Sequence, residues 1–187
     1  CGAGLVQVLR NQPKPGVFLI LPFVHGGFGG WVKAGRPVTT ETVAPKPTDW
    51  VGEPDSSRLA TWRQVREHLG DASTAILVTR SGAEYFGENI RARRGGSIPG
   101  AVNLEWKQNL TSDGRFKSAD DLRSMYAAAG VTPDREVITY CQGGYRAAHA
   151  YVALQIAGFD RIRNYTGSWK EWGDREDLPL ERRSRPH

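Results

Sequence analysis

The stretch that decides the fold spans residues 137–154 and reads Val-Ile-Thr-Tyr-Cys-Gln-Gly-Gly-Tyr-Arg-Ala-Ala-His-Ala-Tyr-Val-Ala-Leu. Its first four residues, 137–140, are apolar or β-branched and predict a buried strand. The alanine-rich run 147–157 predicts a helix that ends at Gly158. A strand that enters a helix through a short glycine-containing loop leaves several backbone N–H groups aimed into one concavity, where the helix dipole adds positive potential.

The six residues between this strand and this helix, 141–146, suggest a nucleophilic site. A thiol at Cys141 should ionise easily, because a helix N-terminus and a nearby arginine can lower a cysteine pKa from about 8.5 to roughly 3.5–7.5. Gly143 and Gly144 let the backbone curl, and Arg146 adds a fixed positive charge. A lone cysteine at a strand end is more often a small buried hydrophobe. The glycine pair and the arginine favour a thiolate nucleophile that handles an anionic substrate.

The rest of the chain alternates strands with helices. Strands are predicted at 75–78 and 161–165, with a shorter one after the turn at 96–100. Helices are predicted at 62–69, capped by Thr61 or Ser57, and at 118–129, where Ser118 and Asp121 form a capping-box-like start. This order predicts an α/β domain with a mainly parallel sheet, whose reactive loop lies at the carboxyl end of a strand.

The complete domain is predicted at residues 58–187, after a linker at 43–57 that is rich in Pro, Gly, Asp and Thr. Residues 1–42 hold an apolar run at 17–21, followed by a Gly-x-aromatic pattern with Trp31 three residues later. The same pattern ends at Trp172 near the other end of the chain. We expect residues 1–42 to be a partial, truncated copy of the same repeat, packed on the complete domain. A chance match of Gly and Trp is the alternative.

Composition narrows the function classes. No run of about 18 apolar residues exists, so no membrane span is expected. The two Cys and four His are scattered and predict neither a metal site nor a disulfide framework, which favours a reducing, cytoplasmic setting. Cys1 is the first residue given, as in a mature lipoprotein, so lipid anchoring is kept as an alternative. The net charge of +5, with arginine clusters at 91–94 and 182–185, suggests a field that attracts small anions rather than nucleic acid, since no groove-reading motif accompanies the clusters.

Three motifs carry a resemblance to a known family. Residues 164–173, Asn-Tyr-Thr-Gly-Ser-Trp-Lys-Glu-Trp-Gly, resemble the C-terminal signature of rhodanese-type sulfurtransferases. Residues 84–87 together with 98–103 resemble their other signature, and residues 141–146 stand where the family keeps a six-residue active loop. The resemblance covers about 58–181, and the segment before it resembles the tail of a preceding, inactive rhodanese repeat.

The resemblance implies a doubly wound sheet with helices on both faces and no cofactor. It implies that Cys141 carries a persulfide and passes a sulfane sulfur from thiosulfate to a thiol or cyanide. The substrate-binding residues are then Gln142, Gly143, Gly144, Tyr145 and Arg146. Gln142 and Tyr145 either line the pocket mouth or are exposed turn residues, and Arg146 is either an anion ligand or a surface charge. His149, Trp169 and Trp172 are expected to pack in the domain rather than to react.

Three departures from the family pattern leave the sulfur donor open. The acidic residue that usually precedes the Arg80-Ser81 pair is absent, Ser97 replaces a common histidine, and Glu84 stands where vertebrate thiosulfate enzymes have arginine. One alternative is 3-mercaptopyruvate, whose carboxylate would need Arg80, Arg91 or Arg93.

Two further alternatives change the class of function. A catalytically idle interaction module with a rhodanese fold would not need the Cys141 thiol. A cysteine-based phosphatase or arsenate reductase would need a Cys-x5-Arg loop to surround a tetrahedral oxyanion. The present loop is Cys-x4-Arg, one residue short, and suits a single sulfur.

Overall fold

The computed structural model describes residues 7–9, 21–44 and 56–185. The chain forms two compact units, Cys1–Gly52 with Leu110–Phe116, and Glu53–Asn109 with Lys117–His187. The second unit holds the reactive loop.

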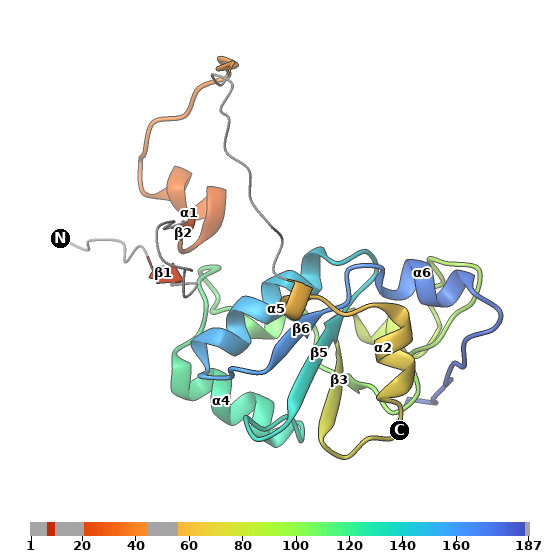
Figure 1. Cartoon of the computed structure of the whole chain (residues 1–187). Helices are drawn as coiled ribbons and strands as arrows, with labels where there is room; N and C mark the ends of the chain where they lie inside the picture. Colours follow the sequence, from red (N-terminus) through yellow and green to blue (C-terminus); the bar gives the residue numbers. More distant parts are fainter. Residues whose placement is uncertain (1–6, 10–20, 45–55, 186–187) are drawn as a thin grey trace. The chain divides into compact units, whose positions relative to one another are not determined.

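The second unit is built on four parallel strands. They are β3 (Thr74–Val78), β4 (Val102–Asn103), β5 (Glu136–Tyr140) and β6 (Ile162–Asn164), and they lie in the order β4-β3-β5-β6 (Figure 1). Val78 pairs with Tyr140, so β3 and β5 end level with each other. The chain therefore leaves the centre of the sheet directly into Cys141, and the predicted parallel α/β sheet is confirmed.

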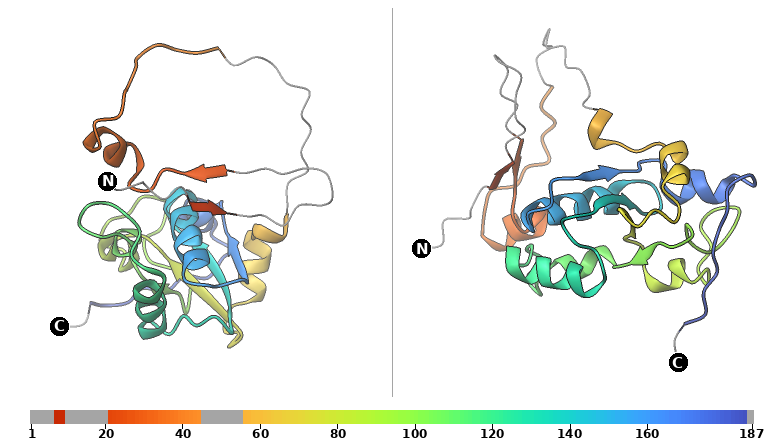
Figure 2. Two further views of the ribbon diagram at one scale, coloured as in Figure 1. Left: turned by 90° about the vertical axis from the view of Figure 1, so that its left-hand side faces the viewer. Right: turned by 60° about the horizontal axis from the view of Figure 1, so that its bottom comes forward.

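Helices cover both faces of this sheet, as the doubly wound arrangement requires (Figure 2). They are α2 (Trp62–Glu67), α3 (Gly82–Tyr85), α4 (Ala119–Ala128), α5 (Tyr145–Ile156) and α6 (Ser168–Asp174), with 3-10 turns at Ser56–Arg58 and Trp106–Asn109. On one face, strand residues Ile76, Val78, Ile138 and Tyr140 join one apolar cluster with Val65 of α2 and Trp169 and Trp172 of α6. On the other face, α5 packs against β5, β6 and α4. The expectation that Trp169 and Trp172 lie in the core is confirmed.

Side-chain caps explain where two of the predicted helices begin. Thr61 accepts a hydrogen bond from the Gln64 backbone N–H, and the Gln64 side chain accepts one from the Thr61 N–H. At α4, the Ser118 hydroxyl accepts a hydrogen bond from the Asp121 backbone N–H. The four-residue helix α3 was not predicted, because a single turn has no apolar period to reveal it. It begins at a reciprocal cap between Ser81 and Glu84.

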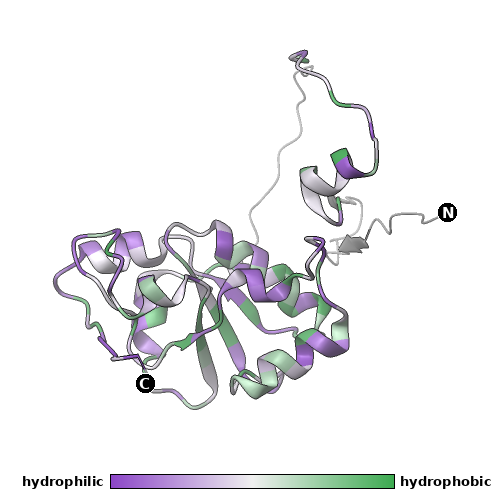
Figure 3. Ribbon diagram, turned by 180° about the vertical axis from the view of Figure 1, so that it is seen from behind, coloured by the Kyte–Doolittle hydropathy of each residue, from purple (hydrophilic) through white to green (hydrophobic). Residues whose placement is uncertain are grey.

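The apolar strands form the interior of the unit. All five residues of β3 are buried, and the central strands are largely green where Figure 3 shows them between the helices. Polar residues dominate the outer helix faces, such as the exposed side of α4. Among the residues that the structure describes, no helix is long and apolar enough to cross a bilayer.

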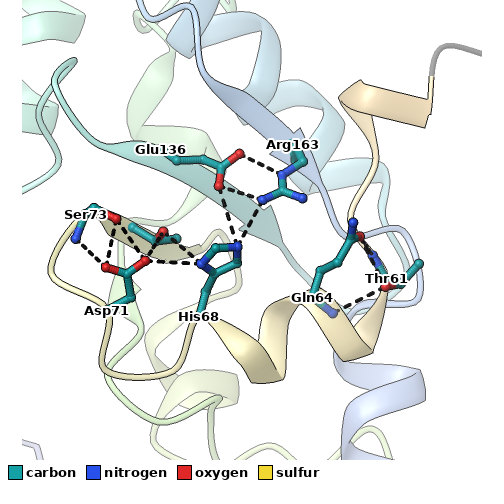
Figure 4. Close-up of polar contacts among 8 residues, drawn as sticks. Thr61, Gln64, His68, Asp71, Ser73, Glu136 and Arg163 are labelled. Carbon is teal, nitrogen blue, oxygen red and sulfur yellow. Dashed lines mark hydrogen bonds and ion pairs between the residues drawn. The ribbon is translucent and has the colours of Figure 1, made fainter.

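A polar network ties α2 to the amino ends of the central strands, at the edge of the sheet away from the reactive loop (Figure 4). Arg163 and Glu136 form a two-bonded ion pair, with nitrogen–oxygen distances of 2.7 and 2.6 Å. His68 lies beside them, with Nε2 3.2 Å from Arg163 Nη2 and Nδ1 3.2 Å from Asp71 Oδ2. Nε2 of His68 also lies 3.9 Å from Oε2 of Glu136. The network fixes the loop that leads from α2 into β3.

In the first unit, β1 (Gln7–Leu9) and β2 (Leu21–Phe23) pair antiparallel, and α1 (Gly27–Lys33) follows. Like α6, α1 is a seven-residue helix after a glycine, with aromatic residues at its second and fifth positions. Phe28 and Trp31 of α1 are exposed, whereas the equivalent Trp169 and Trp172 are buried. Most of the predicted strand at 17–21 and of the predicted linker at 43–57 lies outside the described residues. The partial repeat therefore stays a prediction.

Candidate active site

The loop between β5 and α5 encloses the thiol. Cys141 directly follows β5 and is only 2% exposed. Gly144 precedes α5 with a φ of 92°, and a Cβ built there would lie 3.1 Å from the Thr166 carbonyl oxygen. Both the backbone angle and the space therefore require glycine at this position. The Gly144 N–H donates to the Cys141 sulfur across 3.1 Å.

The helix α5 starts two residues earlier than predicted, at Tyr145, because Gly144 turns the backbone straight into the helix. Arg146 consequently belongs to the first helical turn. Burial of the Cys141 thiol raises its pKa, but hydrogen bonds from the backbone N–H groups of Ala147, Gly143 and Arg146, and the charge of Arg146, outweigh burial and lower that pKa below its ordinary value. The backbone N–H groups of the loop thus stabilise the ionised form of the Cys141 thiol.

The start of α6 holds the loop from its other side. The backbone N–H groups of Trp169 and Lys170 donate to the carbonyl oxygens of Cys141 and Gln142, each at 3.0 Å. The Ser168 hydroxyl accepts from the Cys141 N–H at 3.1 Å and donates to the Tyr165 carbonyl at 2.8 Å. Sequence reasoning included Ser168 in a family signature but gave it no role. The position of Ser168 in that signature was the one feature of the sequence that could have indicated its role.

Glu84 binds the arginine of the loop. Its carboxylate receives both terminal nitrogens of Arg146, at 2.7 and 2.9 Å, and also the N–H and hydroxyl of Ser81. The Arg91 guanidinium lies further off, 3.4 Å from the same carboxylate. Burial raises the pKa of Glu84, yet the bonds from Arg146 and Ser81 lower it to about 2. Glu84 is therefore an ionised carboxylate that faces the loop.

The remaining loop residues divide between packing and solvent. Gln142 is half-buried, and its Nε2 donates to the Arg91 carbonyl at 2.7 Å, so this side chain ties the loop to residues 90–92. Tyr145 is 90% exposed beside the loop. A Cβ at Gly143 would meet no atom within 4 Å. His149 packs edge-on against Trp106 at 5.2 Å between ring centroids, and burial lowers its pKa.

The arginines proposed for a carboxylate substrate lie in different environments. Arg80 is buried under the Trp169 ring, with its guanidinium carbon 4.6 Å from the ring centroid, and it donates to the Gly96 carbonyl. Arg93 forms an ion pair with Glu176 at 2.8 Å. Arg91 is half-exposed and has only its long contact to Glu84 among the ion pairs of the described residues. Of the three, Arg91 is the one that contacts Glu84, the partner of the loop arginine.

The chain is similar in sequence to known proteins, several of which are named as sulfurtransferases. A family model described as "Rhodanese-like domain" matches residues 61–175. A protein named "Thiosulfate sulfurtransferase" from Azotobacter vinelandii is 35% identical over 163 residues, which cover 85% of this chain and 59% of that protein. "Sulfur carrier protein TtuD" from Thermus thermophilus is 36% identical over 170 residues, 84% of this chain and 60% of that protein. This chain thus spans about 60% of the length of these curated relatives.

A solved structure shares the fold. The anaerobic ergothioneine biosynthesis enzyme from Chlorobium limicola, in complex with trimethyl histidine, superposes with a TM-score of 0.78. The superposition covers 84% of this chain and 40% of that chain, at 23% sequence identity, so the likeness concerns the fold alone.

Proposed function

Because this chain belongs to the family of rhodanese-like domains, we propose that it is a sulfurtransferase in which Cys141 carries the transferred sulfur as a persulfide. The observation that supports this role is the ring of backbone N–H groups around the Cys141 sulfur, which favours its ionised form. A thiolate that is buried, yet stabilised by preorganised donors, is suited to hold a second sulfur and to protect it from water.

The reaction proceeds in two covalent steps. The Cys141 thiolate attacks the outer sulfur of thiosulfate, the sulfur–sulfur bond of the donor breaks, and sulfite leaves with the bonding electron pair. The protein then carries Cys141–S–S⁻, whose negative charge the loop N–H groups stabilise. A thiol or cyanide attacks the outer sulfur and departs as a persulfide or thiocyanate, which restores the Cys141 thiolate. The steps require no cofactor.

We assign the loop residues supporting roles around this nucleophile. Gly144, with its positive φ, turns the backbone and donates its N–H to the sulfur, and Gly143 adds a further backbone N–H. Gln142 anchors the loop to the segment that carries Arg91, and we assign the exposed Tyr145 to the surface that an acceptor would approach. Arg146 contributes positive charge from the first turn of α5. Ser168 positions the backbone of Cys141 from α6.

Thiosulfate is the donor we propose, in line with the names of several relatives. The second choice is 3-mercaptopyruvate, and the half-exposed Arg91 favours it as a partner for the carboxylate. We place the reaction in the cytoplasm, where low-molecular-weight thiols are abundant acceptors.

The test is intact mass spectrometry of the folded protein after exposure to thiosulfate. The mass should rise by one sulfur atom, and cyanide should remove it. Cys141→Ser should abolish the adduct, whereas Cys1→Ser, which removes the other of the two cysteines, should retain it. A folded wild-type protein without any adduct would contradict the proposal and favour an idle interaction module. Turnover of an aryl phosphate would favour the phosphatase alternative.

A further inference from the structure

Helix α6 depends on other segments of the chain at both of its ends. It has seven residues, and Gly167 before it provides no side-chain cap. Its last turn carries no basic side chain, and Arg175 follows in an extended conformation rather than in the left-handed turn that often ends a helix. A helix this short is marginal without outside support, so the groups that bind its two ends decide where it lies.

The reactive loop binds the N-terminal end of α6. The N–H groups of Trp169 and Lys170 in the first turn donate to the carbonyl oxygens of Cys141 and Gln142, each at 3.0 Å. The Ser168 hydroxyl accepts from the Cys141 N–H at 3.1 Å. These bonds satisfy the open end of the helix, and they also fix the backbone of the nucleophile. The position of α6 therefore sets the position of Cys141.

Arg94 binds the C-terminal end of α6. Its Nε donates to the Gly173 carbonyl at 3.2 Å, its Nη1 to the Leu178 carbonyl at 3.0 Å and its Nη2 to the Trp172 carbonyl at 3.1 Å. Nη2 also donates to the Arg175 carbonyl. Three nitrogens of one planar guanidinium thus bind four carbonyl oxygens in the last turn of α6 and just after it, where a positive charge also complements the helix dipole.

The backbone around Arg94 is tied to the same helix. The Trp169 indole N–H donates to the Arg94 carbonyl at 3.0 Å, and the Arg93 N–H donates to the Asp174 carboxylate at 2.7 Å. Arg94 is half-buried, and each nitrogen of its guanidinium already donates to a carbonyl. Helix α6 is therefore held between Arg94 at one end and the reactive loop at the other.

We propose that Arg94 is a positioning residue for Cys141: it holds the C-terminal end of α6, and α6 in turn holds the backbone of the nucleophile. Arg94 acts through the helix and not on the substrate. Without its guanidinium, α6 shifts, and the Cys141 sulfur loses its alignment with the N–H donors at the start of α5. The role rests on the proposed sulfurtransferase function, in which Cys141 is the nucleophile.

The experiment measures the reactivity of the Cys141 thiol against pH in Arg94→Met, made in a Cys1→Ser background. Iodoacetamide alkylates the thiolate, so the rate reports the ionisation of Cys141 without any sulfur donor. The pH of half-maximal rate should rise by about one unit, the effect of roughly one N–H donor on an anion. Below that pH the rate should fall about threefold, because fewer thiols are ionised although each thiolate is more nucleophilic.

Two further variants separate position from charge. Arg94→Lys keeps the positive charge but replaces the planar guanidinium by a flexible ammonium, so it should shift the pH profile almost as far as Arg94→Met does. Arg93→Met removes the neighbouring arginine, which pairs with Glu176 at the surface, and it should leave the profile of the background protein unchanged.

Three results would overturn the positioning role. One is a folded Arg94→Met with the profile of the background protein, and another is an Arg94→Lys with that profile, since charge alone would then suffice. The third is alkylation in two phases, one of which matches the protein in urea, because Arg94 would then only keep part of the protein folded. If Arg94→Met does not fold, Arg94→Lys decides.

The sulfurtransferase function is tested separately with thiosulfate. A background protein that forms no Cys141 persulfide would contradict that function, whereas the alkylation profiles would still show whether Arg94 positions the thiol.

Discussion

The hydroxyl of Ser168 accepts a hydrogen bond from the backbone N–H of Cys141 at 3.1 Å. The same hydroxyl donates to the Tyr165 carbonyl at 2.8 Å, and Ser168 is fully buried. Ser168 adopts a φ of 53°, the one positive value at a non-glycine residue in the part of the chain that the structure describes. A residue 27 positions further along the chain therefore sets the position of the nucleophile's backbone, at a cost in backbone strain.

Substitutions at Ser168 should separate the hydrogen bond from the strain. Ser168→Ala leaves the buried Cys141 N–H without its partner and keeps the strained φ, so we expect a loss of about 1–3 kcal/mol of unfolding free energy. Ser168→Gly also loses the hydroxyl but adopts the positive φ freely, and it should be less destabilised by about 1 kcal/mol. Urea unfolding of the three proteins measures both differences. A glycine variant less stable than the alanine variant would show that φ is not a source of strain here.

Gly144 should be intolerant of a side chain, in contrast to its neighbour. Gly144→Ala places a Cβ 3.1 Å from the Thr166 carbonyl oxygen at a φ of 92°, so we expect a loss of about 1–3 kcal/mol. Gly143→Ala meets nothing within 4 Å and has no positive φ, so its unfolding free energy should stay within about 0.5 kcal/mol of the wild type. Thermal or urea unfolding tests the pair. Equal effects at both positions would mean that the loop adapts around Gly144.

The Cys141 thiol should ionise at a lower pH in the folded protein than in the unfolded chain. The N–H groups at the start of α5 stabilise the thiolate and lower its pKa, while burial opposes them. In a Cys1→Ser background, the rate of alkylation by iodoacetamide should reach half its maximum below about pH 8.5, the ordinary value for a free thiol. The same protein in urea is the control. Identical pH profiles in the two states would contradict the stabilised thiolate.

Glu84 should make the protein sensitive to acid. Its pKa falls from an ordinary value of 4.5 to about 2 in the folded state, so its contribution to stability is complete above about pH 4.5. That contribution is lost as the pH falls toward 2. We expect the wild type to lose about 1–2 kcal/mol more than Glu84→Gln between pH 6 and pH 3, after allowance for solvent screening. Urea unfolding at the two pH values measures the difference, and Glu88→Gln should behave as the wild type does.

Local patterns predicted the fold well where residues close in sequence carry the information. The apolar run before Cys141 and the caps at Thr61 and Ser118 are local features, and the structure has the strand and both helices there. The start of α5 was predicted two residues late, because the alanine-rich run is visible in sequence whereas the effect of Gly144 on the backbone is not. Helix α3 was not predicted, because a single helical turn shows no repeat of apolar residues.

The sequence by itself determined the chemistry that the loop can carry: a cysteine, two glycines and an arginine between a strand and a helix, within a parallel α/β frame. Only the tertiary structure decided which groups surround them. Glu84 forms an ion pair with Arg146, 62 residues further along the chain, and Ser168 hydrogen-bonds Cys141, 27 residues earlier. Arg80 is buried against the Trp169 ring. The physical reason is that parallel strands bring distant segments to one edge of the sheet, where charge pairing and burial depend on the side chains that meet there rather than on spacing along the chain.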